Sequence, residues 1–396
     1  MTRVEVPPDS LFGPDNLPYG VYVPRGTDHR TGARVCTRLG DHIIDLSVAL
    51  NDPDFASRDL NTFLARGPRR WREVREQLRE LVDRDIHVEA IHRPAEVELL
   101  LPVRIADYVD FYASIDHATN LGRLFRPDSE PLLPNWRHLP VGYHGRSGTV
   151  VVSGTDIVRP RGQRRTDSGA PDFGPSRRLD IEAELGFVIG VGSELGTSID
   201  TAEFADHVFG VALVNDWSAR DIQAWEYQPL GPFLGKSFAT SLAGWVTPLA
   251  ALDSARVPLP DQVPEPLPYL RESEKWGLDI ELTVRWNGQV VSHPPYSRMY
   301  WSPAQMLAHL TANGAATRTG DLYASGTISG PAPDQRGSFI ELSWGGSEPV
   351  TLDGDTRTFL EDGDEVVITA SAPGPGRRRI GLGEVRGRIR PVHESR

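Results

Sequence analysis

The chain has 396 residues and a formal net charge of −12, with 39% hydrophobic and 24% charged residues. That length allows one large domain or two with a sizeable core. The acidic balance argues against a general binder of nucleic acid or anionic membranes, whose affinity rests on clustered cations. The single cysteine, Cys36, excludes an intrachain disulfide and a thiolate metal site. The chain shows neither a signal peptide nor an apolar run near the ~18–20 residues of a membrane span, so we expect a cytoplasmic protein.

Residues 1–105 are expected to form a separate N-terminal lobe. Turn signals bound a strand over 16–26 and a hairpin over 32–50. One charged helix is predicted over 61–83, and its inner side would carry Phe63, Leu64, Trp71, Val74, Leu78 and Leu81. Pro102 marks the boundary. No cluster of acidic and basic groups suited to catalysis occurs here, which favours a structural or assembly role.

Residues 106–396 are expected to form a β-rich second domain. The chain's 38 glycines and 33 prolines favour short strands and irregular loops, and hence a fold that is mainly β with some α. A strand would place Asp110 and Tyr112 on one face, and a helix from about Ser114 would carry His117 and Asn120. Further strands are predicted over 278–292, with a hairpin turn at Asn287-Gly288, and over 337–344, 362–370 and 381–392.

Residues 178–190, RLDIEAELGFVIG, read as one strand with two faces. Asp180, Glu182 and Glu184 would point to one face, opposite the apolar side chains of Ile181, Ala183, Leu185 and Phe187. Alternate strand residues stand about 6.5–7 Å apart. Glu182 and Glu184 could therefore converge on one cation, whereas a solvated edge strand would explain the same alternation.

A buried strand followed by a polar helix is predicted over 208–227. Asp216 ends the apolar run, and Ser218 with Asp221 forms a weak capping box at the helix start. Four side chains, at spacings of four, three and four, would form one helical stripe: Asp216, Arg220, Gln223 and Tyr227. An acid, a guanidinium, an amide and a phenol on one stripe indicate either a binding face or a salt-bridged solvated face.

Lysine is rare in this chain. Of its 42 cationic residues only Lys236 and Lys275 are lysines, and the other 40 are arginines. A lysine offers a compact point charge that a tight site can require in place of a planar guanidinium. Lys236 lies in a Gly/Pro-rich loop after the polar helix and is a candidate functional residue, whereas Lys275 lies in a charged run and is expected at the surface.

These segments carry a resemblance to a known family. DFYASIDHATNLG, LLPNWRHLPVGYHGRSGTVVVSGT, RLDIEAELGF, LVNDWSARDIQAWEYQPLGPFLGKSF and ASGTISG resemble the fumarylacetoacetase family, and the match covers nearly the whole chain. The resemblance implies a small N-terminal SH3-like barrel, a C-terminal β-sandwich roll and a homodimer. It also implies metal-dependent hydrolysis of fumarylacetoacetate to fumarate and acetoacetate, the last step of tyrosine and phenylalanine degradation.

The resemblance also implies roles for single residues. It places the metal on Asp110, Glu182, Glu184 and Asp216, with Lys236 and Thr240 near that ion or a second one. It makes His117 the general base, oriented by Glu341, with Arg220, Gln223 and Lys236 around the developing oxyanion. It assigns substrate contacts to Tyr112, Arg126, Tyr143, Gln223, Tyr227 and Thr327.

The carboxylate ligands predict a hard ion, Ca²⁺ or Mg²⁺. Four carboxylates, one divalent ion, Arg220 and Lys236 would together form a neutral cluster that can be buried. One departure from the family lies beside the base, where Ile115 and Asp116 replace an arginine–glutamine pair. We expect Asp116 to point to solvent.

Two alternatives stay open from the sequence. One is a related activity with the same metal cage, namely an acylpyruvate-type hydrolase or an oxaloacetate decarboxylase. The other is a non-catalytic scaffold stabilised by a metal, in which His117, Glu341 and Lys236 need not converge on the carboxylates. In every case the expected ligand is a small diketo acid or an ion, without nucleic acid or membrane.

Overall fold

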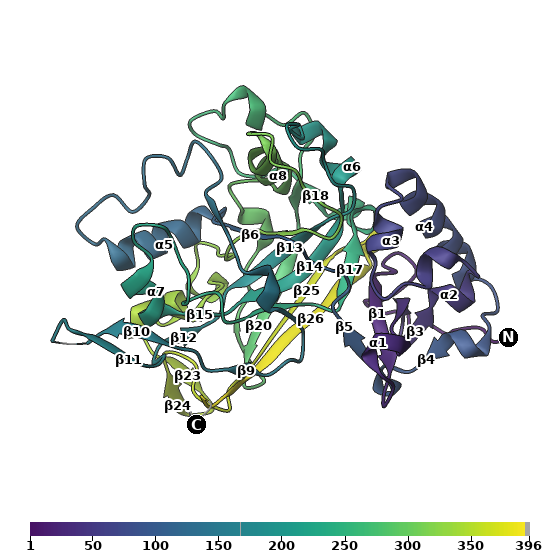
Figure 1. Cartoon of the computed structure of the whole chain (residues 1–396), viewed down its shortest axis with the longest axis horizontal. Helices are drawn as coiled ribbons and strands as arrows, with labels where there is room; N and C mark the ends of the chain where they lie inside the picture. Colours follow the sequence, from purple (N-terminus) through teal and green to yellow (C-terminus); the bar gives the residue numbers. More distant parts are fainter. Residues whose placement is uncertain (167, 393–396) are drawn as a thin grey trace.

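The computed structural model describes residues 1–166 and 168–392 of the chain. It is mainly β with short helices, which confirms the predicted fold class. A small N-terminal lobe packs against a larger body crossed by long strands (Figure 1). The strands of the lobe are β1 Tyr19–Pro24, β2 Arg34–Leu39, β3 His42–Asp45, β4 Ile91–His92 and β5 Val97–Leu100, and its helices are α1 His29–Gly32, α2 Leu46–Ala49, α3 Asn61–Leu64 and α4 Pro68–Val82.

The predicted hairpin of the lobe is confirmed, whereas the single helix over 61–83 is wrong. Strands β2 and β3 pair antiparallel, with Leu39 opposite His42. The helix breaks at Gly67, whose φ of +82° lies outside the helical region, so α3 and α4 are separate. The predicted inner side is otherwise correct, because Trp71, Val74 and Leu78 are buried on α4.

One large sheet forms the centre of the body. Its strands outside the lobe are β6 Tyr108–Phe111, β7 Gly142–His144, β8 Val150–Val152, β13 Ala183–Ile189, β14 Val208–Asp216, β16 Thr240–Leu242, β17 Trp245–Pro248 and β22 Leu322–Ala324. The order along the sheet is β17-β14-β13-β22-β6-β7, with β16 beside β14. All nine residues of β14 are buried, as its apolar run predicts. Strands β6 and β14 end beside the start of β13, because Ala183 lies opposite Asn215 and β22 pairs with both β13 and β6.

A second sheet packs on one face of the first. It contains β9 Ile157–Val158, β20 Glu281–Trp286, β21 Gln289–Ser292, β25 Glu365–Pro373 and β26 Arg379–Arg390. Leu185 and Leu213 of the large sheet share one hydrophobic core with Val284 and Ile368 of this sheet. The predicted turn is present, because Asn287 and Gly288 both have positive φ, +50° and +84°, as a two-residue hairpin requires.

The remaining elements surround these two sheets. Two-stranded pairs are formed by β10 Arg161–Arg165 with β11 Pro171–Pro175, β12 Leu179–Asp180 with β15 Ser218–Ala219, β18 Arg256–Val257 with β19 Gly277–Leu278, and β23 Val350–Leu352 with β24 Asp355–Arg357. The helices are α5 Ile115–Phe125, α6 Phe204–His207, α7 Arg220–Glu226, α8 Pro303–Thr311 and α9 Phe339–Leu342. The β10–β11 hairpin extends from the body away from the lobe (Figure 1). Within the described ranges, no helix has the length and apolar character needed to span a bilayer.

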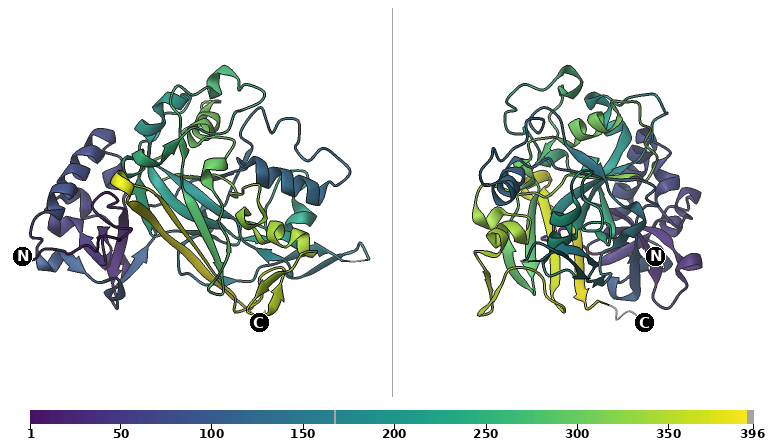
Figure 2. Two further views of the ribbon diagram at one scale, coloured as in Figure 1. Left: turned by 180° about the vertical axis from the view of Figure 1, so that it is seen from behind. Right: turned by 60° about the vertical axis from the view of Figure 1, so that its left-hand side comes forward.

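The N-terminal lobe is continuous with the body. Strand β1 pairs with β17, with Tyr19 opposite Val246, so the strands of the lobe extend the large sheet. Phe209 of β14 packs against both Tyr19 and Trp71 of the lobe. The Asn16 amide donates to the carbonyl of Gly381 at 2.7 Å, which ties the lobe to β26. Strand β26 accordingly begins beside the lobe and runs away from it across the body, while its antiparallel neighbour β25 runs toward the lobe (Figure 2).

Candidate metal and catalytic site

Four carboxylates meet where strands of the large sheet end. Asp110 lies in β6, Glu184 in β13 and Asp216 at the end of β14, and Glu182 immediately precedes β13. All four are buried, and one oxygen from each lies within 4.8 Å of the others. The sheet thus brings together the four residues that the resemblance assigned to a metal.

The electrostatics of this cluster fit a cation. Neither oxygen of Glu184, nor Oδ1 of Asp110, has a hydrogen-bond partner among the described residues. Burial, followed by the neighbouring carboxylates, raises the pKa of the Glu184 and Asp110 carboxyls well above their ordinary values. Buried oxygens without donors, close to other carboxylates, are the ligands that a hard divalent ion such as Ca²⁺ or Mg²⁺ takes. The four residues therefore fit such an ion.

Two cationic side chains, Lys236 and Arg220, contact the carboxylate cluster. The buried Lys236 ammonium donates to Glu182 and, at 2.8 Å, to Oδ2 of Asp216. The Arg220 guanidinium pairs with Oε1 of Glu182 at 2.8 Å. Burial by itself would raise the pKa of Glu182, but these two cations outweigh it and lower that pKa. Glu182 is thereby held as an anion between the cluster and the cations.

Thr240 and Tyr143 complete the surroundings of Asp216. Thr240 Oγ1 donates to Oδ1 of Asp216 at 2.7 Å, and the Tyr143 hydroxyl donates to Oδ2 at 3.2 Å. Tyr143 lies on β7 directly opposite Asp110 on β6. These contacts orient the ligand residue, while Lys236 and Thr240 bond to Asp216 instead of offering free ligand atoms.

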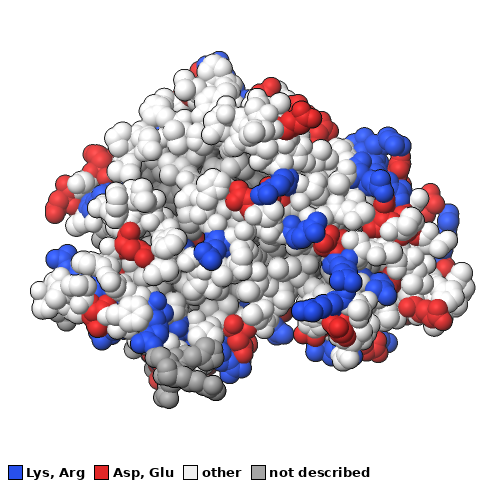
Figure 3. Space-filling model, in the orientation of Figure 1, with Lys and Arg blue, Asp and Glu red and all other residues white. Residues whose placement is uncertain are grey.

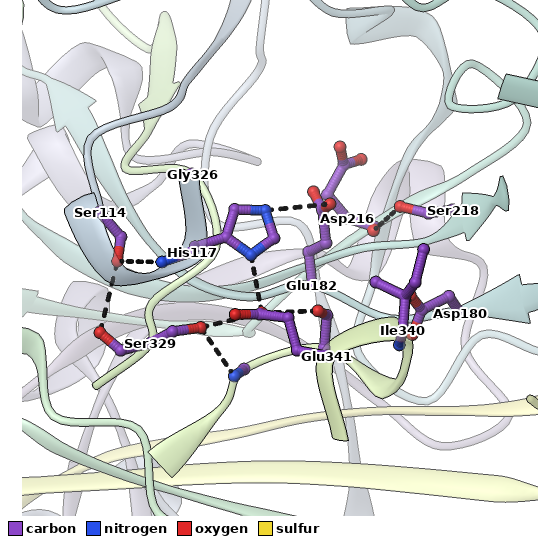
Figure 4. A network of polar contacts seen from close by, with 12 residues as sticks. Ser114, His117, Asp180, Glu182, Asp216, Ser218, Gly326, Ser329, Ile340 and Glu341 are labelled. Atoms are coloured by element: carbon purple, nitrogen blue, oxygen red, sulfur yellow. Dashed lines mark hydrogen bonds and ion pairs between the residues drawn. The ribbon is translucent and has the colours of Figure 1, made fainter. Parts of the chain in front are cut away.

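His117 and Glu341 form a buried dyad beside the cluster. His117 Nδ1 and Glu341 Oε2 are 2.7 Å apart, and the opposite ring nitrogen, Nε2, lies 4.0 Å from Oε1 of Glu182 (Figure 4). Helix α5 places His117 there, because the Ser114 hydroxyl caps the helix by accepting from the His117 N–H. The ring of Tyr112 stands edge-on to the imidazole, 5.3 Å away. Nε2 is therefore the nitrogen that faces the carboxylate cluster.

Three neutral donors hold Glu341, and sequence reasoning did not assign them. Asn120 Nδ2 donates to Oε1 at 2.9 Å, and the hydroxyls of Ser329 and Ser338 donate to Oε2 at 2.9 and 2.7 Å. Burial by itself would raise the pKa of Glu341, but His117, Asn120 and Ser338 lower it. The i, i+3 spacing of His117 and Asn120 on one helix was an available signal. The Ser-x-x-Glu spacing of Ser338 and Glu341 was a second local signal, whereas nothing local in the sequence links Ser329 to Glu341.

A cavity of about 550 Å³ opens onto these groups. Its lining includes most residues assigned to catalysis or substrate: Tyr112, His117, Arg126, Tyr143, Arg220, Gln223, Tyr227, Lys236 and Thr327, with Asp110 and Glu182 from the cluster. Glu341 lies behind His117 and does not line the cavity. The buried Nε of Arg126 and the hydroxyl of Thr327 have no partner among the described residues and are available to a ligand. Apolar side chains that the sequence did not single out also line it, among them Leu121, Phe125, Trp136 and Leu230.

The structure corrects the predicted strand over 178–190. It is two strands, β12 and β13, separated at residues 181–182. Asp180 therefore lies outside the four-carboxylate cluster, and its Oδ2 accepts from Arg220 Nε at 2.7 Å. The predicted neutral charge count left out this fifth carboxylate, which shares Arg220 with Glu182.

The polar stripe is also corrected at both ends. Asp216 belongs to β14, and α7 begins only at Arg220 and ends at Glu226, so Tyr227 follows it. The capping box is wrong, because Ser218 pairs with Asp180 in a strand and its hydroxyl donates to the carbonyl of Asp216. Asp221 instead accepts from the Ser176 hydroxyl at 2.6 Å. Arg220, Gln223 and Tyr227 nevertheless all line the cavity.

Two further expectations near the base are wrong. Glu341 lies in the helical turn α9 and not in a strand over 337–344. Asp116 does not point freely to solvent, since it is half-buried and its Oδ2 is enclosed without a partner among the described residues. Burial raises the pKa of the Asp116 carboxyl.

Removal of divalent cations with a chelator is expected to lower the melting temperature of this protein. An ion that binds only the folded state at 100 times its Kd adds about 2.7 kcal/mol to the free energy of unfolding. Glu182→Ala and Glu184→Ala are each expected to lose bound metal and this stabilisation. Glu184→Gln should retain its melting temperature when the chelator is added, because it removes both a ligand and a source of repulsion in the empty cluster.

Thermal melting, with metal content determined by elemental analysis, measures these effects. Glu194→Gln is the matched control, because Glu194 is exposed on the same segment of chain and should leave both quantities unchanged. A wild-type melting temperature that does not respond to chelation would contradict a metal at this cluster.

Comparison with known proteins identifies the family. Residues 107–390 match the family model for the fumarylacetoacetate hydrolase C-terminal region, and residues 15–102 match the one for the fumarylacetoacetase N-terminal region. The chain is similar to the fumarylacetoacetase of Homo sapiens, with 45% identity over 419 residues that cover 99% of each chain. It is also similar to that of Arabidopsis thaliana, with 44% identity over 415 residues and 98% of each chain.

Solved structures share the fold at low sequence identity. A fumarylacetoacetate hydrolase from Exiguobacterium antarcticum aligns with a TM-score of 0.59 and 17% identity, over 95% of this chain and 99% of the other. A 5-carboxymethyl-2-hydroxymuconate delta-isomerase from Mycobacterium smegmatis aligns with a TM-score of 0.53 and 17% identity, over 96% and 100%. The fold alone thus occurs in proteins with more than one activity. The two family models and the near-full-length relatives, in contrast, all indicate one family. The chain belongs to the fumarylacetoacetate hydrolase family, with both the N-terminal and C-terminal regions of the fumarylacetoacetases.

Proposed function

We propose that this protein hydrolyses the carbon–carbon bond of 4-fumarylacetoacetate to give fumarate and acetoacetate, the last step of tyrosine and phenylalanine degradation. The observation that carries the proposal is the His117–Glu341 dyad, 2.7 Å apart and facing the four-carboxylate cluster across one cavity. The choice of substrate is based on the fumarylacetoacetases to which the chain is 44–45% identical over nearly its whole length.

His117 acts as the general base through Nε2. Its Nδ1 is held by Glu341, so the nitrogen directed toward the cluster is the one available to take a proton from water. The water oxygen bonds to the ketone carbon that becomes the new carboxylate of fumarate. Glu341 fixes the tautomer and stabilises the imidazolium, as the acid of a triad does. A histidine that carries a proton on both ring nitrogens has no free lone pair and cannot act as a base, so Nε2 of His117 must be unprotonated before it takes the proton from water.

Breaking the carbon–carbon bond leaves its electron pair with the acetoacetate half, which then takes up a proton. Arg220, Lys236 and Gln223 border the cavity where negative charge develops on oxygen. The Arg220 guanidinium donates to Oε1 of Gln223 at 3.1 Å, and this contact leaves the amide N–H groups of Gln223 free to donate. A divalent cation held by Asp110, Glu182, Glu184 and Asp216 supplies Lewis acidity for that charge when it is bound.

Arg126 and Thr327 are assigned to the substrate. The unpartnered Arg126 Nε and Thr327 hydroxyl supply hydrogen-bond donors in a cavity that also has an apolar wall. A carboxylate at the end of a diketo acid can accept from both. Tyr112, Tyr143 and Tyr227 also line the cavity and complete the proposed substrate contacts.

The same proposal includes the identity of the metal ion, the cellular location, the oligomeric state and the division into domains. Oxygen-only ligands favour Ca²⁺ or Mg²⁺ as the ion. The family resemblance supports a cytoplasmic homodimer with an SH3-like N-terminal domain at 1–105 and a catalytic domain at 106–396. Acidic and basic side chains are interspersed over the face shown in Figure 3, and the net charge is −12, which supports a small-molecule substrate over nucleic acid or a membrane surface.

A substrate panel tests the proposal. Metal-stripped and metal-restored protein is assayed with fumarylacetoacetate, an acylpyruvate and oxaloacetate, and loss of the diketone absorbance is followed, with pyruvate release for oxaloacetate. We expect fumarylacetoacetate to be cleaved with the highest kcat/KM and only when metal is present. A preference for an acylpyruvate or for oxaloacetate would replace the proposed activity by a related one. No turnover of any of the three would favour a metal-stabilised scaffold.

A further inference from the structure

Asp180 connects two parts of the site that lie far apart in the sequence. Its carboxylate is fully buried and accepts hydrogen bonds at both oxygens. Oδ2 accepts from Arg220 Nε at 2.7 Å and from the Ile340 N–H at 3.1 Å. Oδ1 accepts from the Phe339 N–H at 2.7 Å and from the N–H of Ile181 at 2.8 Å. One side chain thus holds both Arg220, which borders the proposed oxyanion position, and the segment just before Glu341, where Ile340 lies beside Asp180 in Figure 4.

These contacts make Asp180 the cap of α9. The first N–H groups of a helical turn need an acceptor, which an N-cap serine usually provides. Ser338 occupies the N-cap position but makes no such bond. Its hydroxyl donates instead to Oε2 of Glu341 at 2.7 Å. Because Asp180 caps the turn from outside, Ser338 is free to position the carboxylate of the dyad.

We propose that Asp180 is a positioning residue that fixes Arg220 and Glu341 relative to each other, and through Glu341 the base His117. It does not line the cavity, so it acts only through these partners. A displacement of about 1 Å in a catalytic group can cost about a hundredfold in rate. This inference rests on the proposed hydrolysis for its kinetic test, while its structural test is independent of substrate.

The test compares Asp180→Asn with wild type on whichever diketo acid of the panel the wild type cleaves. The amide keeps the shape of the side chain but removes the negative charge that pairs with Arg220, and it places its own N–H groups opposite other donors. We expect kcat to fall at least about tenfold with KM within about threefold, at unchanged metal content. In a Glu341→Gln background the same change should cost a smaller factor in kcat than in the wild type, because the part of its effect that passes through Glu341 is already lost. Hydrogen exchange of peptide 337–343 should accelerate at least about tenfold.

Asp321→Asn is the matched control. Asp321 is buried, accepts from the N–H groups of Asp107 and Arg318 at 3.0 and 2.8 Å, and lies 3.6 Å from the Arg318 guanidinium. It does not line the cavity. We expect Asp321→Asn to lower the melting temperature while kcat and exchange of peptide 337–343 stay at wild-type values.

Several results would overturn the proposal. Unchanged hydrogen exchange of peptide 337–343 in Asp180→Asn would overturn the positioning role, whether or not the wild type cleaves a substrate. Absence of substrate cleavage by the wild type would refute the proposed function separately. An equal loss of kcat in the wild-type and Glu341→Gln backgrounds would also overturn the positioning role. If Asp180→Asn does not fold, the smaller Asp180→Ser takes its place. Failure of both to fold, when Asp321→Asn folds, would make Asp180 a residue of the fold and not of positioning.

Discussion

His117→Ala is expected to fold, to bind metal and to lose most of its turnover. Loss of a general base typically costs a factor of about 10²–10⁴ in rate. The substitution also removes the hydrogen-bond partner that His117 Nδ1 provides to the buried Glu341, and this is expected to lower the free energy of unfolding by about 1–3 kcal/mol. His117→Asn, which can still donate to Glu341, should lose a similar factor in kcat with a smaller loss of stability.

Steady-state kinetics at a temperature well below the melting point of each variant separates the two effects. His309→Ala is the control, since His309 contacts the Tyr269 hydroxyl and does not line the cavity. It should retain wild-type kcat. If His117→Ala keeps more than half of the wild-type rate, His117 has no part in the mechanism.

Lys236→Arg is expected to fold and to bind metal, but to lose at least about tenfold in turnover, with Lys236→Ala worse. The ammonium is buried and donates to both Glu182 and Asp216. A planar guanidinium is larger and carries its donors in a fixed fork, so it cannot occupy the same point between two carboxylates. Loss of one oxyanion donor costs about 10²–10³ in kcat, which is about 3–4 kcal/mol.

The chain supplies its own control for this substitution. Lys275, the other lysine, is exposed, and Lys275→Arg should be indistinguishable from wild type in kcat and metal content. Kinetics and metal analysis on all three variants decide the matter. A fully active Lys236→Arg would mean that Lys236 only balances charge.

The sequence predicts those parts of the site in which local pattern and structure agree. The apolar run before Asp216 is a buried strand, and the residues after Ser114 form the helix that carries His117. A continuous apolar run in the first segment and a helix start at Ser114 in the second agree with the structure that forms, and neighbouring strands or helices only add to it. The same holds for the acidic pair Glu182 and Glu184, which stays together across the break between β12 and β13.

Local pattern fails where a distant group competes for the backbone. Residues 337–344 alternate like a strand, but Asp180 accepts from the N–H groups of Phe339 and Ile340, which stabilises a helical turn. Ser218 and Asp221 match a capping box, but Ser218 is drawn into a bridge with Asp180. These partners are separated by 38 to 160 positions, and spacing within one segment carries no information about them.

The continuity between lobe and body has a consequence for how the chain folds during synthesis. The first half of β1 pairs with β17, so Tyr19 has no strand partner on that side until Val246 has emerged from the ribosome. The hydrogen bond from the Asn16 amide to the carbonyl of Gly381, 365 positions later, can form only after Gly381 has been translated. Contacts this distant are slow to form and leave a strand edge open to wrong pairing meanwhile. Residues 16–20 are translated before these partners and are thus among the last to be fixed in place, so nascent chains halted before residue 381 are expected to be prone to aggregation and dependent on chaperones.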